Sequence, residues 1–207
     1  LFYKVSWNYR FHFLTMLKSF LNKFQQVITE KPVLPAQNKP DKLTVKKMNE
    51  LLEKHLPATT VAYCIDLWQK QPFSFKISRT RSSCFGNYIF RDGQHKITIN
   101  HDLNAYAFLV TYIHEIAHQR AWLNKGRKRI EPHGKEWKKS FQDLMLPILN
   151  EDFLPKKLLL PLSAYMQNPA ASSVSYAPLA EALRSFDTGE QIGISLSEVI
   201  DNQWFEF

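Results

Sequence analysis

The 207-residue sequence has only two cysteines and no hydrophobic run long enough to cross a membrane. Cys64 and Cys84 are too few for a disulfide framework or a four-cysteine zinc site. One disulfide between them is compatible with the sequence, but the simpler interpretation is that both are free thiols in a reducing compartment. The best apolar stretch, residues 105–113, reaches about half of the roughly 20 residues that a membrane helix needs. We therefore expect a cytoplasmic protein that can associate with the nucleoid.

Composition excludes two further classes of protein. Hydrophobic residues make up 44% of the chain and charged residues 22%, which excludes disorder throughout and a fibrous repeat. Of 27 Lys and Arg, only three lie in residues 151–207, whereas eight of the 19 Asp and Glu lie there. A basic body is thus followed by an acidic C-terminal segment, which makes nucleic acid a candidate partner of the body.

The N-terminal part of the sequence predicts helices around a linker. Apolar residues recur at intervals of three and four over residues 14–29, which predicts a packing helix. Three prolines within residues 31–41 indicate an extended linker. A helix over residues 43–56 follows, with Thr44 near its cap and Pro57 after its end.

A change in the spacing of apolar residues marks a small sheet in the middle of the chain. Before this sheet, a helix is expected to run to about Lys70, with Thr59 or Thr60 as its cap. From Phe73 apolar and polar residues alternate, and the Asp92-Gly93 pair predicts a hairpin between residues 88–91 and 95–100. Helical spacing returns over residues 104–123 and 134–146. The order predicts an α+β fold in which helices pack on a small antiparallel sheet.

A metal-binding pattern lies inside the helix that follows the sheet. His114 and His118 are four residues apart, so both imidazoles project from one helix face and can bind one metal ion. Between them, Glu115 has the position of a general base directed at a water on the metal. Zinc is the expected metal, because neutral imidazoles suit it and it ionises water near pH 7 without redox chemistry.

A third ligand is expected at the start of the next helix. His133 would complete three protein ligands and leave a fourth position open, with Glu131 or Glu136 as competitors for the same role. Tyr106 and Tyr112 could assist the reaction, although aromatic residues in such a helix usually belong to the core. The other four histidines have no partner at ligand spacing and are expected to play no part in the site: His12, His55, His95 and His101.

This part of the sequence resembles the SprT-like (Spartan-related) zinc metallopeptidase family. The resemblance is carried by the motif His114-Glu115-Ile116-Ala117-His118, by a basic loop of fourteen residues, and by His133-Gly134 with Trp137. The resemblance covers residues 44–149 and implies a zincin-like domain with one zinc ion held by His114, His118 and His133, and with Glu115 as catalytic base. No cysteine follows Cys84, so the cysteine-rich zinc ribbon of many such proteins is either missing or lies beyond Phe207. Three parts are expected: a helix and linker at 1–41, the SprT-like domain at 42–150, and an acidic, weakly structured extension at 151–207.

If the site is a protease, Glu115 takes a proton from the water and returns it to the leaving amine. The strand at residues 96–100 could bind an extended substrate at the sheet edge. The predicted activity is that of a metalloendopeptidase, with DNA-associated proteins among its expected substrates. The alternative is a nucleic-acid-associated binding module whose zinc is structural or catalytically idle.

A basic rim with Trp122 and Trp137 could contact single-stranded DNA, and its members are Arg120, Lys125, Arg127, Lys128, Arg129, Lys135, Lys138 and Lys139.

Overall fold

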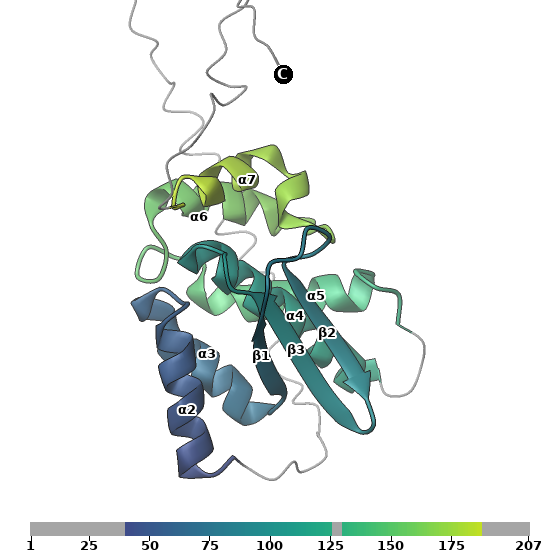
Figure 1. Cartoon of the computed structure of the whole chain (residues 1–207). Helices are drawn as coiled ribbons and strands as arrows, with labels where there is room; N and C mark the ends of the chain where they lie inside the picture. The colour runs from purple at the N-terminus through teal and green to yellow at the C-terminus, as the bar shows by residue number, and fades with distance from the viewer. Residues whose placement is uncertain (1–39, 126–129, 188–207) are drawn as a thin grey trace, which may run out of the picture.

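The computed structural model describes residues 40–125 and 130–187 and shows an α+β arrangement of helices on a small sheet (Figure 1). The predicted helix at 14–29 and the linker up to residue 39 lie outside the described residues. In chain order the elements are α2 (Lys42–Glu53), α3 (Ala58–Lys70), β1 (Ser74–Ser78), β2 (Gly86–Arg91), β3 (Gln94–Asn100), α4 (Ala105–Lys125), α5 (Lys135–Met145), the 3-10 helix η1 (Leu146–Ile148), α6 (Lys156–Tyr165), the 3-10 helix η2 (Ser173–Ser175) and α7 (Ala177–Arg184).

The first two helices lie close to their predicted positions but begin differently. Asp41 caps α2, because its Oδ1 atom accepts a hydrogen bond from the Thr44 N–H at 2.8 Å. The predicted caps of α3 are wrong, since that helix starts after Pro57 without any side-chain cap. Thr60 is instead inside the first turn, where its hydroxyl donates to the Pro57 carbonyl at 2.8 Å. The fixed φ of Pro57 suits the residue that separates the two helices.

The sheet has three strands in the order β1-β3-β2, and it is mixed rather than antiparallel. The predicted β2–β3 hairpin is confirmed, with Asp92 and Gly93 both at positive φ in its turn. β1, however, pairs with β3 in parallel, from Ser74 opposite Lys96 to Ser78 opposite Asn100. The alternation of apolar residues specifies which face of a strand is buried, but it carries no information on strand direction. β3 is therefore the central strand and β2 is an edge.

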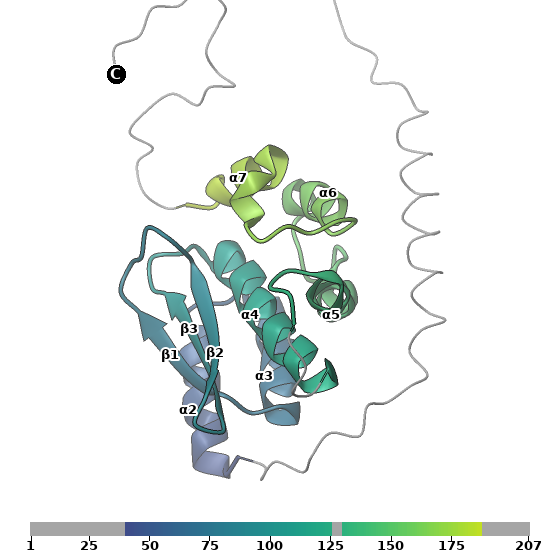
Figure 2. The same cartoon turned by 90° about the vertical axis from the view of Figure 1, so that its right-hand side faces the viewer.

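One face of the sheet is covered by helices, and α4 lies between that face and α5 (Figure 2). The side chains of Ile97 and Ile99 on β3 are fully buried against this helical layer. α4 is buried around much of its circumference, with Phe108, Tyr112 and Ile113 fully inside the core. A helix packed on both sides in this way holds its side chains in fixed positions, which is what a binding site requires.

Residues 151–187 fold into helices, which corrects the prediction of a weakly structured extension for that part of the chain. α6 and α7 pack beside one another, and Leu158, Leu162 and Leu179 are fully buried. The side chain of Asn104 joins α7 to the start of α4 by donating to the Leu183 carbonyl at 2.9 Å. Ala, Ser and Pro are frequent between these leucines, which obscures the helical spacing in the sequence. Residues 188–207 lie outside the described part of the chain.

Both cysteines are free, with Cys64 buried and Cys84 exposed. Among the described residues, no helix combines the length and the apolar character that a membrane span requires.

Candidate metal centre

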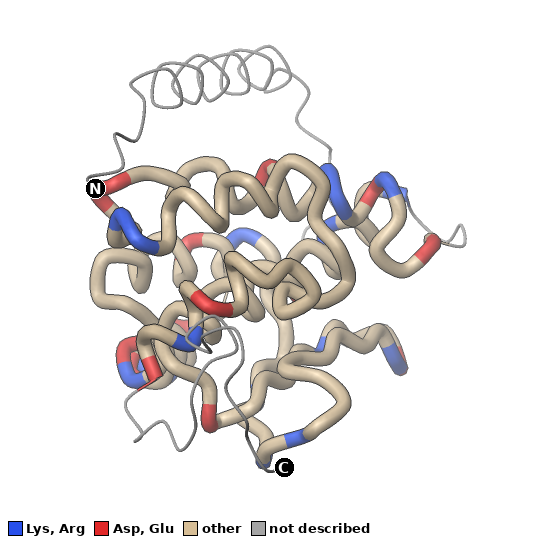
Figure 3. The backbone as a smooth tube through the Cα atoms, turned by 90° about the horizontal axis from the view of Figure 1, so that it is seen from above, with Lys and Arg blue, Asp and Glu red and all other residues tan. Residues whose placement is uncertain are grey.

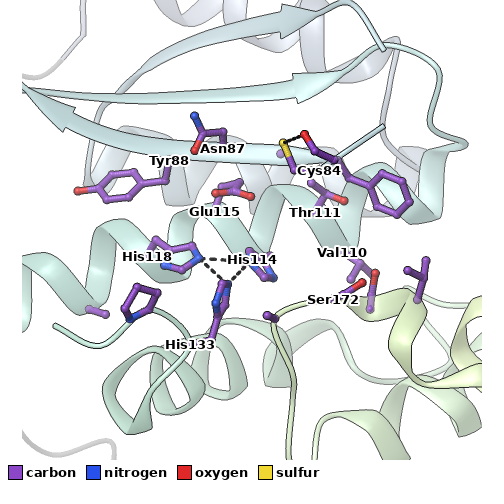
Figure 4. Close-up of a pocket in the computed structure, with 18 of the residues that line it drawn as sticks. Cys84, Asn87, Tyr88, Val110, Thr111, His114, Glu115, His118, His133 and Ser172 are labelled. Atoms are coloured by element: carbon purple, nitrogen blue, oxygen red, sulfur yellow. Dashed lines mark hydrogen bonds between the residues drawn. The ribbon is translucent and has the colours of Figure 1, made fainter. Parts of the chain in front are cut away.

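Two of the predicted ligands project from the middle of α4. His114 and His118 are one helical turn apart, and their ring centroids are 5.0 Å from each other. Asn104 fixes the start of this helix, because its Oδ1 atom accepts hydrogen bonds from the N–H groups of Tyr106 and Ala107 at 3.1 and 3.0 Å. The rigid helix thus presents both imidazoles to the same cleft (Figure 4).

The third histidine comes from the turn that precedes α5. His133 has φ +60°, in the left-handed region that few residues other than glycine adopt. The turn is closed by a hydrogen bond from the Gly134 N–H to the Glu131 carbonyl at 3.0 Å. A backbone held in this conformation aims the His133 ring at the two rings of α4, as Figure 4 shows.

The three imidazoles meet through their Nε2 atoms. The distance is 3.1 Å from His133 to His114, 3.1 Å from His133 to His118 and 3.2 Å from His114 to His118. Each ring nitrogen is either a donor or an acceptor, so at least one pair of the three must present two N–H groups or two lone pairs to each other. A cation removes this conflict, and tetrahedral zinc with bonds of about 2.0–2.1 Å would place its nitrogens about 3.3 Å apart. The three histidines could therefore hold a metal ion.

Burial keeps these imidazoles in the neutral form that metals bind. Burial, with the neighbouring His118 and His133, lowers the pKa of His114 from 6.5 to about 2. Burial and the nearby His133 lower the pKa of His118 to about 3. The pKa of His133 is lowered too, again by burial. At neutral pH all three rings are thus available as ligands.

Trp137 forms the support beneath the three rings. Its side chain is fully buried, and its ring centroid lies 4.6 Å from that of His114, 4.7 Å from that of His133 and 5.5 Å from that of His118. The indole N–H donates to the His114 carbonyl at 3.3 Å. One side chain from the first turn of α5 therefore fixes ligands from two elements.

Glu115 lies on the β2 side of α4 and lines the same cleft as the histidines (Figure 4). Glu115 as a whole is only 5% exposed to solvent. Burial raises the pKa of Glu115 from 4.5 to about 8, against the charge of Arg81 and a hydrogen bond from the Tyr88 backbone, which both lower it. A carboxyl group in such a position can exchange a proton near neutral pH.

Tyr88 and His95 belong to the surroundings of the site, although sequence reasoning gave neither a role there. The Tyr88 ring is parallel to that of His118, with centroids 6.2 Å apart, and its hydroxyl lies 2.9 Å from Nδ1 of His95. These residues are far from the motif in sequence and reach it only because the hairpin of β2 and β3 packs on α4. No local sequence signal could have found them.

The other candidate ligands do not join the group. Among the described residues, only the three histidines bring at least three possible ligand atoms together. Glu136 is instead bound to Lys125, at 2.5 Å between Oε1 and Nζ. Tyr112 is fully buried and donates to the Cys64 carbonyl, while Tyr106 packs on Phe186, so neither tyrosine lines the cleft.

The site opens into a cleft of about 720 Å³. Residues 82–88 form one wall, α4 forms the floor, and residues 171–174 form the opposite wall. Ile130, Pro132 and Trp122 also line the cleft.

A family model described as the SprT-like family matches residues 47–150. The chain belongs to the SprT-like family. The matched segment begins within α2 and ends just after η1, so it contains all three histidines and Glu115. No match to this chain is found among the curated proteins or among the solved structures.

Proposed function

We propose that this SprT-like protein is a zinc-dependent metalloendopeptidase. The observation that carries the proposal is the convergence of three neutral imidazoles at 3.1–3.2 Å in the same cleft as the buried Glu115 carboxyl. Three protein ligands leave a coordination position open, which is typical of catalytic zinc sites rather than structural ones. Membership of a family that is generally related to metallopeptidases supports the same function.

His114, His118 and His133 are proposed to hold the ion. Bound there, zinc would supply a Lewis acid that polarises a peptide carbonyl and lowers the pKa of water to about 7. The Glu115 carboxylate then takes a proton from water in the cleft and passes it to the amine nitrogen that leaves. Its burial favours the protonated state after the first transfer, so the carboxyl group can hold that proton until the peptide bond breaks.

The substrate is proposed to bind along β2, which changes the strand predicted from the sequence. Residues 96–100 lie in β3, which is paired on both sides and has no edge to offer. β2 is an edge strand, and its residues Gly86, Asn87 and Tyr88 line the cleft. An extended peptide can add to such an edge through main-chain hydrogen bonds, with the scissile bond beside Glu115.

We also propose contact with nucleic acid, through fewer groups than the sequence predicts. Arg127, Lys128 and Arg129 lie outside the described residues, and Trp137 is buried and cannot stack on a base. Figure 3 shows basic positions interspersed with acidic ones along the described chain. Of the described rim, Lys125 pairs with Glu136 and Lys139 with Asp143, and Lys138 donates to Asn168. Arg120 and Lys135 are in no ion pair among the described residues, and they are the proposed contacts.

Hydrolysis in water enriched in oxygen-18 tests the proposal. The zinc-loaded protein is incubated with an unfolded protein substrate, and the fragments are analysed by mass spectrometry. We expect one heavy oxygen in each new carboxyl terminus with the wild type and no new termini with Glu115→Gln. Equal cleavage by both proteins would remove Glu115 from the mechanism. Zinc binding without cleavage by either would favour a binding module with idle zinc.

A further inference from the structure

The second wall of the cleft comes from a part of the chain that the family match does not cover. Residues 171–174 connect α6 to α7, beyond the matched segment 47–150. Figure 4 shows Ser172 of this connection beside Val110 of α4, on the side of His114 that faces away from His118. The cleft is therefore completed by a segment that belongs to the C-terminal helices.

This wall is held in place from both sides. Before it, the Tyr165 hydroxyl donates to the Ala170 carbonyl at 2.6 Å, and the Gln142 side chain of α5 donates to the Met166 carbonyl at 2.8 Å. After it, the Tyr176 ring stacks on Tyr165, and Leu179 is fully buried. Because both flanks are fixed to the body, the wall presents a defined surface to the cleft.

Apolar side chains from all three sides line the cleft, although that of Val110 is only 2% exposed. Phe85 comes from the wall formed by residues 82–88 and is 37% exposed, and Val174 comes from the opposite wall and is 47% exposed. Val110 lies in α4, one helical turn before His114, and lines the cleft with them. Large apolar groups that stay exposed inside a concave site gain free energy when a ligand covers them.

Charge is nearly absent from the lining. Glu115 is the only Asp, Glu, Lys or Arg among the described residues that line the cleft. A charged substrate side chain at the Phe85 end would thus lose water without gaining a counterion there, which is unfavourable. The basic rim of the protein does not alter this, because none of its described lysines and arginines lines the cleft.

We propose that Phe85, Val110 and Val174 form a subsite for an apolar substrate side chain on the C-terminal side of the cleaved bond. The inference rests on the proposed peptidase function and on an antiparallel pairing of substrate with β2. β2 runs from the Phe85 end of the cleft towards Tyr88, so the C-terminal half of an antiparallel substrate reaches the Phe85 end. Leucine or phenylalanine is accepted there, and aspartate or lysine is rejected.

Matched peptides that differ only in the residue after the cleaved bond test this subsite. With the zinc-loaded wild type, kcat/KM is expected to be at least tenfold higher for Leu than for Asp or Lys. Val174→Ala is expected to lower kcat/KM for the Leu peptide roughly three- to tenfold, because two methyl groups no longer cover the substrate, and to lower it less for an Ala peptide. Leu160→Ala serves as the control, since Leu160 is 54% exposed on α6 and does not line the cleft.

The same peptides are also measured for binding to zinc-loaded Glu115→Gln by fluorescence polarisation, which needs no turnover. Cleavage without preference among the peptides, or an equal effect of Val174→Ala on all of them, would overturn the subsite while the peptidase function stands. A Leu preference in binding that Val174→Ala removes, without cleavage by the wild type, would support the subsite and contradict the peptidase function. If the peptides bind without preference and the wild type cleaves none of them, both the subsite and the peptidase function would be overturned.

Discussion

A Cβ atom built on Gly86 would lie 2.5 Å from Oε1 of Glu115, closer than real Cβ contacts occur. The same atom would be 2.7 Å from Cγ2 of Thr111, so two side chains of α4 would have to move. β2 can therefore approach the carboxyl group this closely only because residue 86 has no side chain.

Gly86→Ala is expected to reduce peptide hydrolysis at least tenfold while the protein still binds one zinc ion. The substitution displaces Glu115 or β2, because the three atoms nearest to the added Cβ belong to Glu115 and Thr111 and not to a histidine. Gly93→Asn is the control, because no atom lies within 4 Å of a Cβ at Gly93 and asparagine tolerates its φ of +74°. Unchanged hydrolysis by Gly86→Ala would show that this close approach has no role in the reaction.

Trp137→Phe is expected to weaken zinc binding by about tenfold, since the ring that supports the ligands loses its N–H bond to the His114 carbonyl. Trp68→Phe provides a matched control. Trp68 is also buried and donates to a carbonyl, that of Phe73 at 3.0 Å, but its indole makes no such bond to a proposed ligand. Both variants should lose some stability to urea, and only Trp137→Phe should lose zinc affinity. Equal zinc affinities would contradict the supporting role.

The metal-free protein is expected to lose stability as the pH falls from 7 to 5. The pKa values of His114 and His118 are about 2 and 3 in the folded state against 6.5 when unfolded. Below pH 6.5 the unfolded chain therefore binds more protons at these residues, and their contribution to stability is lost progressively towards pH 3. Glu115 acts in the opposite direction, because its raised pKa contributes stability that is complete below pH 4.5 and lost as the pH rises through about 8.

Urea unfolding of the chelated protein at the two pH values measures this balance. The free energy of unfolding should be lower at pH 5 than at pH 7, and the difference should be larger in Glu115→Gln, which lacks the opposing carboxyl group. Equal differences in the two proteins would contradict the raised pKa of Glu115. No difference in either would contradict the depressed pKa values of the histidines.

Single-stranded DNA is expected to bind with a strong dependence on salt. The two proposed phosphate contacts, through Arg120 and Lys135, would lower the affinity by roughly sevenfold between 50 and 200 mM salt. Arg120→Gln with Lys135→Gln should weaken binding and reduce this slope, whereas Lys46→Gln on α2, remote from the rim in sequence, should do neither. Binding that is insensitive to salt would contradict the phosphate contacts.

The parts of this protein that depend on local spacing can be predicted from its sequence. The four-residue interval from His114 to His118 places two imidazoles on one helix face in any α-helix, and the Asp92-Gly93 pair suits one type of hairpin turn. His133 is brought to the other two histidines as the pattern predicts.

Relationships between distant segments could not be predicted in the same way. The parallel pairing of β1 depends on how the chain crosses from Ser78 to Gly86, and alternating polarity is the same for both strand directions. The contacts of Glu115 with Gly86 and the Tyr88 backbone arise from packing of β2 on α4. The wall at residues 171–174 likewise depends on α6 and α7, whose packing no short motif specifies.

Zinc content and peptide hydrolysis, measured together on the wild type, Glu115→Gln and His133→Ala, test the central claim most directly. We expect one zinc ion per chain in the wild type and in Glu115→Gln, lower zinc affinity in His133→Ala, and hydrolysis by the wild type alone. A wild type that binds no zinc, or a Glu115→Gln variant that hydrolyses peptides at the wild-type rate, would contradict a three-histidine centre served by Glu115.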